Sequence, residues 1–146
     1  MRYQEKVEQF MIAGEQDAPL TPTVPDSPTA WLRANMLFSE VNEYKEAKSA
    51  CYQAKLNLGT DQTTTQQAAL VGMADALADM VYVIYGTAAT YGIDLDNVLD
   101  IVHDANMRKL VDGKVVKDEH GKIQKPDGWT PPEPEIYAAM FGGARG

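Results

Sequence analysis

A long apolar segment that contains two acidic residues constrains the fold of this chain most strongly. Between Gln62 and Ile93 only Asp75 and Asp79 carry charge, and apolar or small side chains surround them. We expect such a segment to be buried, and an ionised carboxylate is costly to bury without a partner. The two acids are four residues apart, so on a helix they share one face. A bound cation would relieve their repulsion, and a metal site is therefore the first hypothesis.

Length, composition and charge restrict the class of protein. A chain of 146 residues with 45% hydrophobic residues is typical of one globular domain, here spanning residues 1–146. The net charge of −8 argues against nucleic-acid binding, which needs a basic surface. Cys51 is the single cysteine, which favours a cytoplasmic location. We expect no signal peptide and no membrane contact, because the uncharged stretch from Met80 to Ile93 is too short to span a bilayer.

Apolar periodicity and helix breakers predict an all-α fold. Ser27 followed by Pro28 is typical of a helix start, and Asp94 is a second candidate cap. The prolines between residues 15 and 27 predict an extended connector. The predicted helices span residues 2–13, Ser27 to about Leu58, Thr63 or Thr64 to near Gly92, and Asp94 to about Lys109. Their short connections indicate an antiparallel four-helix bundle over about residues 2–110.

Residues 111–146 have a different texture. Weak alternation and turn glycines between Asp112 and Gln124 predict a small hairpin. Several prolines follow, so we expect an irregular tail with one helical turn from Ile136 to Phe141.

The second predicted helix carries another acidic pair, Glu40 and Glu43. At about 100° per residue, Glu43 lies about 60° from Glu40, and both belong to the side that faces the core. Glu46 points elsewhere and is expected to be solvated. Four inward carboxylates, from Glu40, Glu43, Asp75 and Asp79, would form the oxygen-rich ligand set that Mg²⁺ or Mn²⁺ prefers.

A zinc site and a set of structural salt bridges are the two alternatives to a Mg²⁺ or Mn²⁺ site. With one cysteine, and with His103 and His120 as the only histidines, zinc is disfavoured. The remaining competitor is a set of structural salt bridges from the acids to Arg33 or Lys48.

The residues around the two acidic pairs resemble a known family. The runs Leu-Phe-Ser-Glu-Val-Asn-Glu at 37–43 and Ala-Asp-Ala-Leu-Ala-Asp-Met-Val-Tyr at 74–82 are similar to the MazG-like all-α nucleotide pyrophosphohydrolases, relatives of phosphoribosyl-ATP pyrophosphohydrolase that include phage members. The resemblance extends over nearly the whole chain. It includes Phe10-Met11, Arg33, Gly86-Thr87-Ala88, Asn106 to Lys109, Gly121-Lys122 and Lys125-Pro126.

This resemblance implies an activity and a cofactor. The expected reaction is Mg²⁺- or Mn²⁺-dependent attack of water on the α-phosphorus of a (deoxy)nucleoside triphosphate, which releases the monophosphate and pyrophosphate. A (d)GTP substrate is the first choice, and a homodimer or homotetramer is expected. By matching position, Glu40, Glu43 and Asp79 would be the catalytic metal ligands.

The chain departs from the family pattern at two positions. Ser39 and Ala76 stand where family members often have glutamate. Asp75 lies on nearly the same face as Asp79 and is a candidate for the missing oxygen. The number of metal ions and the general base therefore stay open.

Further residues are candidates for substrate contact. The phosphate-binding candidates are Asn106, Lys109, Lys122, Lys125 and Arg33, and the base-binding candidates are Phe10, Ile12, Gln16 and Trp31. The alternatives are a helix-end lysine favoured by the macrodipole, ordinary solvated lysines and core aromatic residues. A dUTP- or dCTP-directed pyrophosphatase and a non-enzymatic helical adaptor remain as alternative functions.

Overall fold

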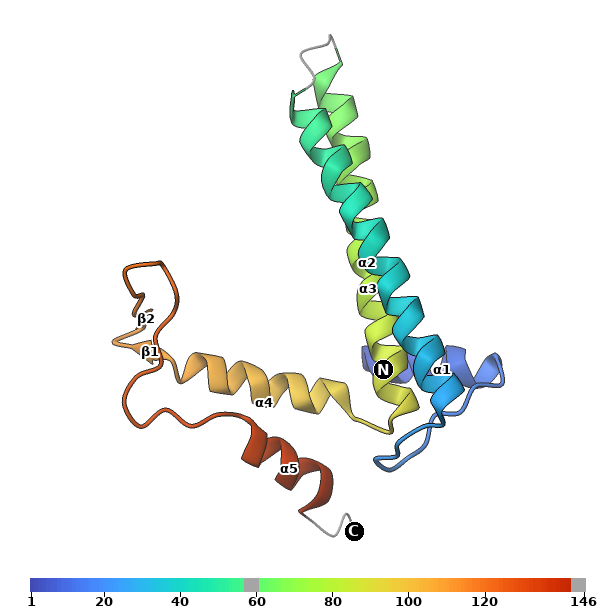
Figure 1. Cartoon of the computed structure of the whole chain (residues 1–146), viewed down its shortest axis with the longest axis vertical. Coiled ribbons are helices and arrows are strands. Elements are labelled where there is room, and N and C mark those ends of the chain that lie inside the picture. The colour runs from blue at the N-terminus through green and yellow to red at the C-terminus, as the bar shows by residue number, and fades with distance from the viewer. Residues whose placement is uncertain (57–60, 143–146) are drawn as a thin grey trace. The chain divides into compact units, whose positions relative to one another are not determined.

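The computed structural model describes residues 1–56 and 61–142 and confirms that the chain is mainly helical (Figure 1). Contacts divide the chain into two compact units, and the division in the sequence falls between Gly92 and Ile93. The first unit holds α1 (Tyr3–Ala13), α2 (Ser27–Leu56) and α3 (Gln62–Thr90). The second holds α4 (Leu95–Met107), β1 (Leu110–Val111), β2 (Lys114–Val115) and α5 (Glu133–Phe141).

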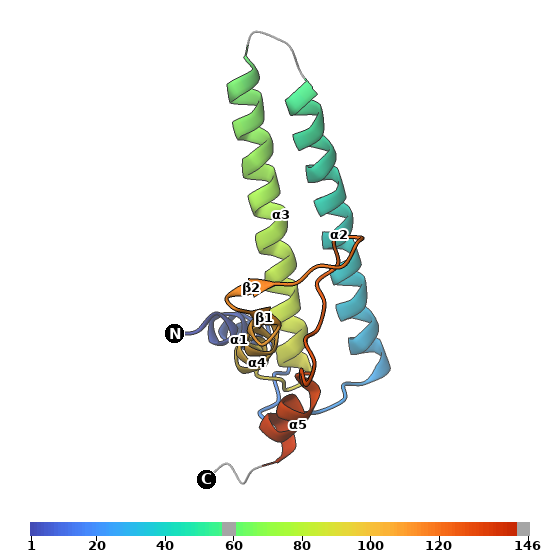
Figure 2. The same cartoon turned by 90° about the vertical axis from the view of Figure 1, so that its left-hand side faces the viewer.

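In the first unit, α2 and α3 run antiparallel and lie side by side in both views (Figures 1 and 2). Gly86 of α3 leaves room for the Arg33 side chain of α2. Further along the pair, Cys51 Sγ lies 3.4 Å from the Ala69 carbonyl oxygen and donates to it. These contacts set the register in which the two helices face each other.

The short helix α1 packs on α3. Val7 and Met11 are buried, at 2% and 3% exposure, and form the inner face of α1. The Phe10 ring meets the Tyr82 ring edge-on, with 5.9 Å between their centroids. The predicted helix over residues 2–13 is thus confirmed to within one residue at its start.

The boundaries of α2 and α3 follow recognisable local signals. The cap of α2 is Asp26, whose Oδ1 accepts from the Thr29 amide at 2.9 Å, and not Ser27 as predicted. Proline at the second helical position still fits, because a helix start does not need that amide. The predicted end of α2 near Leu58 lies outside the described residues. Beyond α3, Gly92 has a φ of 65°, and a side chain there would collide with the Thr21 carbonyl.

In the second unit, α4 begins at the predicted cap, where Asp94 accepts from the Asn97 amide at 3.3 Å. A hairpin is present as predicted, but it starts earlier than Asp112, because its strands β1 and β2 pair Leu110 with Val115. In the rest of the predicted range, Lys117 and Ile123 form an isolated antiparallel bridge. Asp112 and Gly113 both have positive φ, 51° and 77°, as a two-residue hairpin turn requires.

The last helix is longer than predicted. α5 spans Glu133–Phe141, whereas the sequence predicted one turn from Ile136. Pro132 and Pro134 stand at the helix start, where proline is tolerated, and so they do not delay the helix.

The four-helix bundle is not confirmed, because α4 packs with α5 in the second unit while α1 to α3 form the first. The predicted burial of residues 62–93 is also wrong for much of α3. Its most apolar 18-residue window is only 17% buried, because α2 covers one side and α1 covers the last turns. Exposed apolar residues form a stripe on α3 made of Leu70, Leu77, Val81 and Ile84.

Among the described residues, α3 is long and apolar enough to cross a membrane by length and composition alone. One such helix is weak evidence, because the core helix of a soluble protein meets the same criterion, and the absence of membrane contact stays a prediction.

Candidate metal centre and phosphate-binding residues

Three of the four predicted acidic ligands come together between α2 and α3. Each of Glu40, Glu43 and Asp79 offers one carboxylate oxygen, and these oxygens all lie within 4.8 Å of one another. Glu40 and Glu43 are one turn apart on α2, and the antiparallel register brings Asp79 of α3 opposite them. Glu40 is half-buried and Glu43 is exposed, so this three-carboxylate cluster can be reached from solvent.

The electrostatics of the cluster favour a cation. Burial raises the pKa of Glu40, and so do the close carboxylate of Glu43 and the charges of Asp79 and Asp75. Oxygen Oε2 of Glu40 has no access to water and no hydrogen-bond partner among the described residues. A buried, unpartnered carboxylate oxygen is costly, and a bound divalent ion would remove that cost.

No lysine or arginine forms an ion pair with the cluster in the part of the chain that the structure describes. The predicted competitor, structural salt bridges to Arg33 or Lys48, is therefore not seen. Hard oxygen donors without a basic partner fit Mg²⁺ or Mn²⁺.

Asp75 lies outside the group of carboxylates that come within 4.8 Å of one another, so its role as a fourth metal ligand stays a prediction. Its side chain is exposed, and it acts on Glu40 only through its charge. Ala76, one of the two departures from the family pattern, is buried at 5% exposure. Ser39, the other departure, is exposed and offers no carboxylate.

Arg33 is buried without an acidic partner among the described residues. Its exposure is 6%, Nη2 donates to Gln16 Oε1 at 2.7 Å, and Nη1 lies 4.0 Å from Met36 Sδ. Burial lowers the pKa of its guanidinium. The predicted base-binding residue Gln16 is thus the hydrogen-bond partner of the predicted phosphate-binding residue Arg33.

The other base-binding candidates lie on the surface of the first unit. Phe10, Ile12 and Trp31 are each 65% exposed. An exposed aromatic side chain is available for stacking, but nothing in the described residues encloses a base around them.

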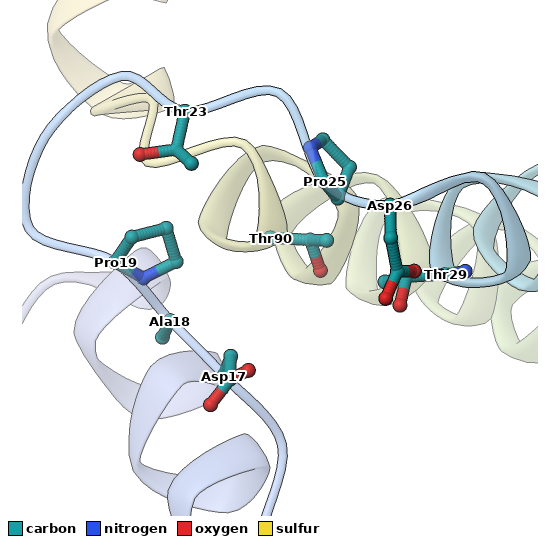
Figure 3. Close-up of a pocket in the computed structure, with 8 residues that line it drawn as sticks. All are labelled: Asp17, Ala18, Pro19, Thr23, Pro25, Asp26, Thr29 and Thr90. Carbon is teal, nitrogen blue, oxygen red and sulfur yellow. Dashed lines mark hydrogen bonds between the residues drawn. The ribbon is translucent and has the colours of Figure 1, made fainter.

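A pocket of about 330 Å³ lies elsewhere in the first unit and was not anticipated from the sequence (Figure 3). It forms where the proline-rich connector returns to α3, because the Thr23 amide donates to the Tyr91 carbonyl at 2.9 Å. Asp17, Asp26, Thr29 and Thr90 contribute its polar groups. Thr29 and Glu40 are eleven residues apart on α2, about 16 Å along the axis, so the pocket is separate from the cluster.

The remaining phosphate-binding candidates lie in the second unit. Lys109 Nζ donates to Asn106 Oδ1 at 3.0 Å, which shows that the two side chains predicted to be neighbours do meet. Lys109 and Lys125 both lie over the Trp129 ring, at 5.3 Å and 4.9 Å from its centroid. Lys122 is exposed, and its backbone amide donates to Asp118 Oδ1 at 2.9 Å.

Comparison with known proteins gives a family match that includes the carboxylate cluster. No curated protein matched the sequence. The profile of the phosphoribosyl-ATP pyrophosphohydrolase family matches residues 5–106, which include all three residues of the carboxylate cluster. The chain therefore belongs to the phosphoribosyl-ATP pyrophosphohydrolase family, the MazG-like all-α nucleotide pyrophosphohydrolases.

Proposed function

We propose that this protein hydrolyses a (deoxy)nucleoside triphosphate at the α-phosphorus to the monophosphate and pyrophosphate, with Mg²⁺ or Mn²⁺ as cofactor. The observation that supports this most is the convergence of Glu40, Glu43 and Asp79 without a basic partner among the described residues. Membership of a pyrophosphohydrolase family supports the same class of reaction.

Each residue of the cluster has a defined task in this proposal. Glu40 and Glu43 bind the cation from α2, and Asp79 binds it from α3. A divalent ion bound there supplies positive charge for the phosphates and lowers the pKa of a water molecule. Lys109 and Lys125 bind the phosphate chain as charged donors, and Asn106 orients Lys109 through its amide oxygen.

We propose (d)GTP as the substrate and assign residues of the first unit to its base. The preference for (d)GTP rests on the resemblance to phage relatives, and dUTP and dCTP are the alternatives. Phe10, Ile12 and Trp31 are exposed on the unit that carries the cluster, and we assign them to contacts with the base. Arg33 stays a candidate phosphate contact, provided that the substrate displaces Gln16 from it.

We also propose that the protein forms a homodimer or homotetramer in the cytoplasm. At about 100° per residue, the stripe of Leu70, Leu77, Val81 and Ile84 lies on one side of α3, opposite Asp79. A second copy that covers this stripe would bury apolar surface and leave the carboxylate cluster on the other side of the helix.

The direct test is pyrophosphate release from a panel of ribo- and deoxynucleoside triphosphates with Mg²⁺, with Mn²⁺ and with chelator. We expect metal-dependent release that falls on the order of 10²-fold or more in Glu43→Gln and Asp79→Asn. Glu46→Gln is the matched control, because Glu46 is exposed on the same helix outside the cluster. Equal turnover by folded cluster variants and the control would exclude the proposed roles, and no turnover of any nucleotide would favour the adaptor.

A further inference from the structure

Trp129 closes the end of α4 in the second unit. The helix ends at Met107, and the Lys109 amide donates to the Asn106 carbonyl at 3.0 Å, which leaves the Ala105 carbonyl without its helical donor. The indole Nε1 of Trp129 donates to that carbonyl at 2.8 Å. The side chain therefore satisfies a helix-end carbonyl that would otherwise stay unpaired.

A short turn brings the indole to this place. The Trp129 amide donates to the Pro126 carbonyl at 3.0 Å, and Gly128 within the turn has a φ of 77°. Positive φ is readily adopted by glycine, so the turn forms at little cost. Lys125 immediately precedes the turn and is carried to α4 together with the indole.

The indole gathers two ammonium groups from separate segments. Lys109 Nζ lies 5.3 Å and Lys125 Nζ 4.9 Å from the centroid of the same ring. The negative face of an indole attracts cations, which accounts for each contact taken alone. Each ammonium group keeps its charge, so two positive charges from separate segments lie beside the Trp129 ring.

Neither lysine is neutralised by a carboxylate among the described residues. Lys109 is bonded to the neutral Asn106 amide oxygen, and Lys125 contacts the ring alone. The neighbouring Arg108 differs, because its Nη2 lies 2.9 Å from Glu135 Oε1 and forms an ion pair with this residue of α5. In a chain with 21 acidic and 13 basic residues, Lys109 and Lys125 thus bring two positive charges to one ring without a carboxylate partner among the described residues.

We propose that Trp129 is a positioning residue that holds Lys109 and Lys125 together as a binding site for a polyphosphate. Two ammonium groups from different segments match two linked phosphates better than one, because each phosphate can receive its own charged donor. The proposal rests on the proposed function, in which the polyphosphate belongs to the nucleotide. It differs from it in making Trp129, which does not touch the phosphates, the residue that sets their affinity.

The test is calorimetric binding of inorganic pyrophosphate to the full chain, with orthophosphate as the second arm. We expect pyrophosphate to bind more tightly than orthophosphate. Lys125→Gln should weaken pyrophosphate binding about 10-fold. Lys125→Arg should restore most of the affinity, because arginine keeps the charge and also stacks on indole. Lys114→Gln is the matched control, since Lys114 is exposed on β2 and is not one of the two lysines that lie over the ring.

Two substitutions separate positioning from stability. Trp129→Phe keeps an aromatic face and loses the Nε1 donor, whereas Trp129→Leu loses both, so pyrophosphate affinity should fall further in Trp129→Leu. If nucleotide turnover is observed, these variants should raise KM with little change in kcat. A purely structural tryptophan would lower Tm and leave the pyrophosphate affinity of the folded protein unchanged.

The outcomes distinguish this proposal from the function on which it rests. Pyrophosphate binding that depends on Lys125 and Trp129, without nucleotide turnover, would keep the site and reject the proposed function. Equal affinity of the wild type, Lys125→Gln and Lys114→Gln would overturn the site even if turnover is observed. Should Trp129→Leu fail to fold, Trp129→Phe still tests the positioning role, and Lys125→Gln and Lys125→Arg still test the site.

Discussion

Arg33 and Gly86 meet at the interface of α2 and α3, where a β carbon on Gly86 would lie 2.7 Å from Arg33 Nη1. Glu40 lies seven residues after Arg33 on α2, and Asp79 lies seven residues before Gly86 on α3. Since the helices are antiparallel, the contact of Arg33 with Gly86 and the carboxylate cluster occupy the same interface, about two helical turns apart. The glycine thus helps to set the register that brings Asp79 to Glu40.

A side chain at Gly86 should disturb this interface. We expect Gly86→Ala to displace the Arg33 guanidinium and to lower the free energy of unfolding by about 1–3 kcal/mol, as overpacking does. Gly72→Ala on the exposed part of α3 is the control, because an added β carbon meets nothing within 4 Å. That control should gain about 0.5–1 kcal/mol from the higher helix propensity of alanine. Urea unfolding measures both, and equal effects of the two substitutions would contradict the role assigned to Gly86.

The raised pKa of Glu40 predicts how metal-free stability depends on pH. In the folded chain this carboxyl holds its proton more tightly than in the unfolded chain, where the ordinary value is 4.5. The folded state therefore loses stability as pH rises from about 4.5 through the raised pKa.

Replacing Glu40 with glutamine should remove this loss. We expect the Tm of metal-free Glu40→Gln to exceed that of the wild type at neutral pH and to approach it at lower pH. Mg²⁺ should raise the Tm of the wild type more than that of the variant. Thermal unfolding with chelator and with Mg²⁺ checks both, and a Tm difference that does not change with pH would contradict the assignment.

Asp75 and Asp79 should differ in their effect on metal binding, although they are neighbours on α3. Asp79 offers an oxygen to the cluster, whereas Asp75 is exposed and contributes only its charge. We expect Asp75→Asn to weaken Mg²⁺ binding severalfold less than Asp79→Asn, as titration calorimetry would show. A loss in Asp75→Asn equal to that in Asp79→Asn would instead support the ligand role predicted from the sequence.

Local signals in the sequence were sufficient for much of the fold. Helical periodicity and the Asp94 cap predicted helices, and weak alternation with turn glycines predicted a hairpin in the segment that begins near Asp112. The angular positions of Glu40 and Glu43 also predicted that both lie on one side of α2, and in the structure Asp79 of α3 meets them there.

Tertiary contacts explain what the sequence did not predict. Apolar composition indicated that α3 is buried. Composition does not say which other elements cover the helix, and the stripe of Leu70, Leu77, Val81 and Ile84 is exposed. The pocket near Thr90 forms because the connector returns to α3. The position of Trp129 depends on its hydrogen bond to the Ala105 carbonyl, which lacks a donor within the helix. Neither relationship has a periodic signal in the sequence.

Self-assembly through the stripe on α3 is testable with one substitution. Leu70 is 60% exposed and starts the stripe, so Leu70→Glu should shift the protein towards the monomer by placing a charge in the proposed interface. Leu20→Glu is the control, because Leu20 is 97% exposed in the connector. Sedimentation velocity measures the species. A wild-type monomer, or an unchanged oligomer in Leu70→Glu, would contradict assembly through this face.

We propose that Glu40, Glu43 and Asp79 together bind a divalent ion between α2 and α3. The most direct measurement is Mn²⁺ binding followed by electron paramagnetic resonance, in which the signal of free Mn²⁺ falls as the ion binds. We predict binding by the wild type and by Glu46→Gln, and an affinity lower by more than about 10-fold in Asp79→Asn. Undiminished Mn²⁺ binding by folded Asp79→Asn would contradict the claim.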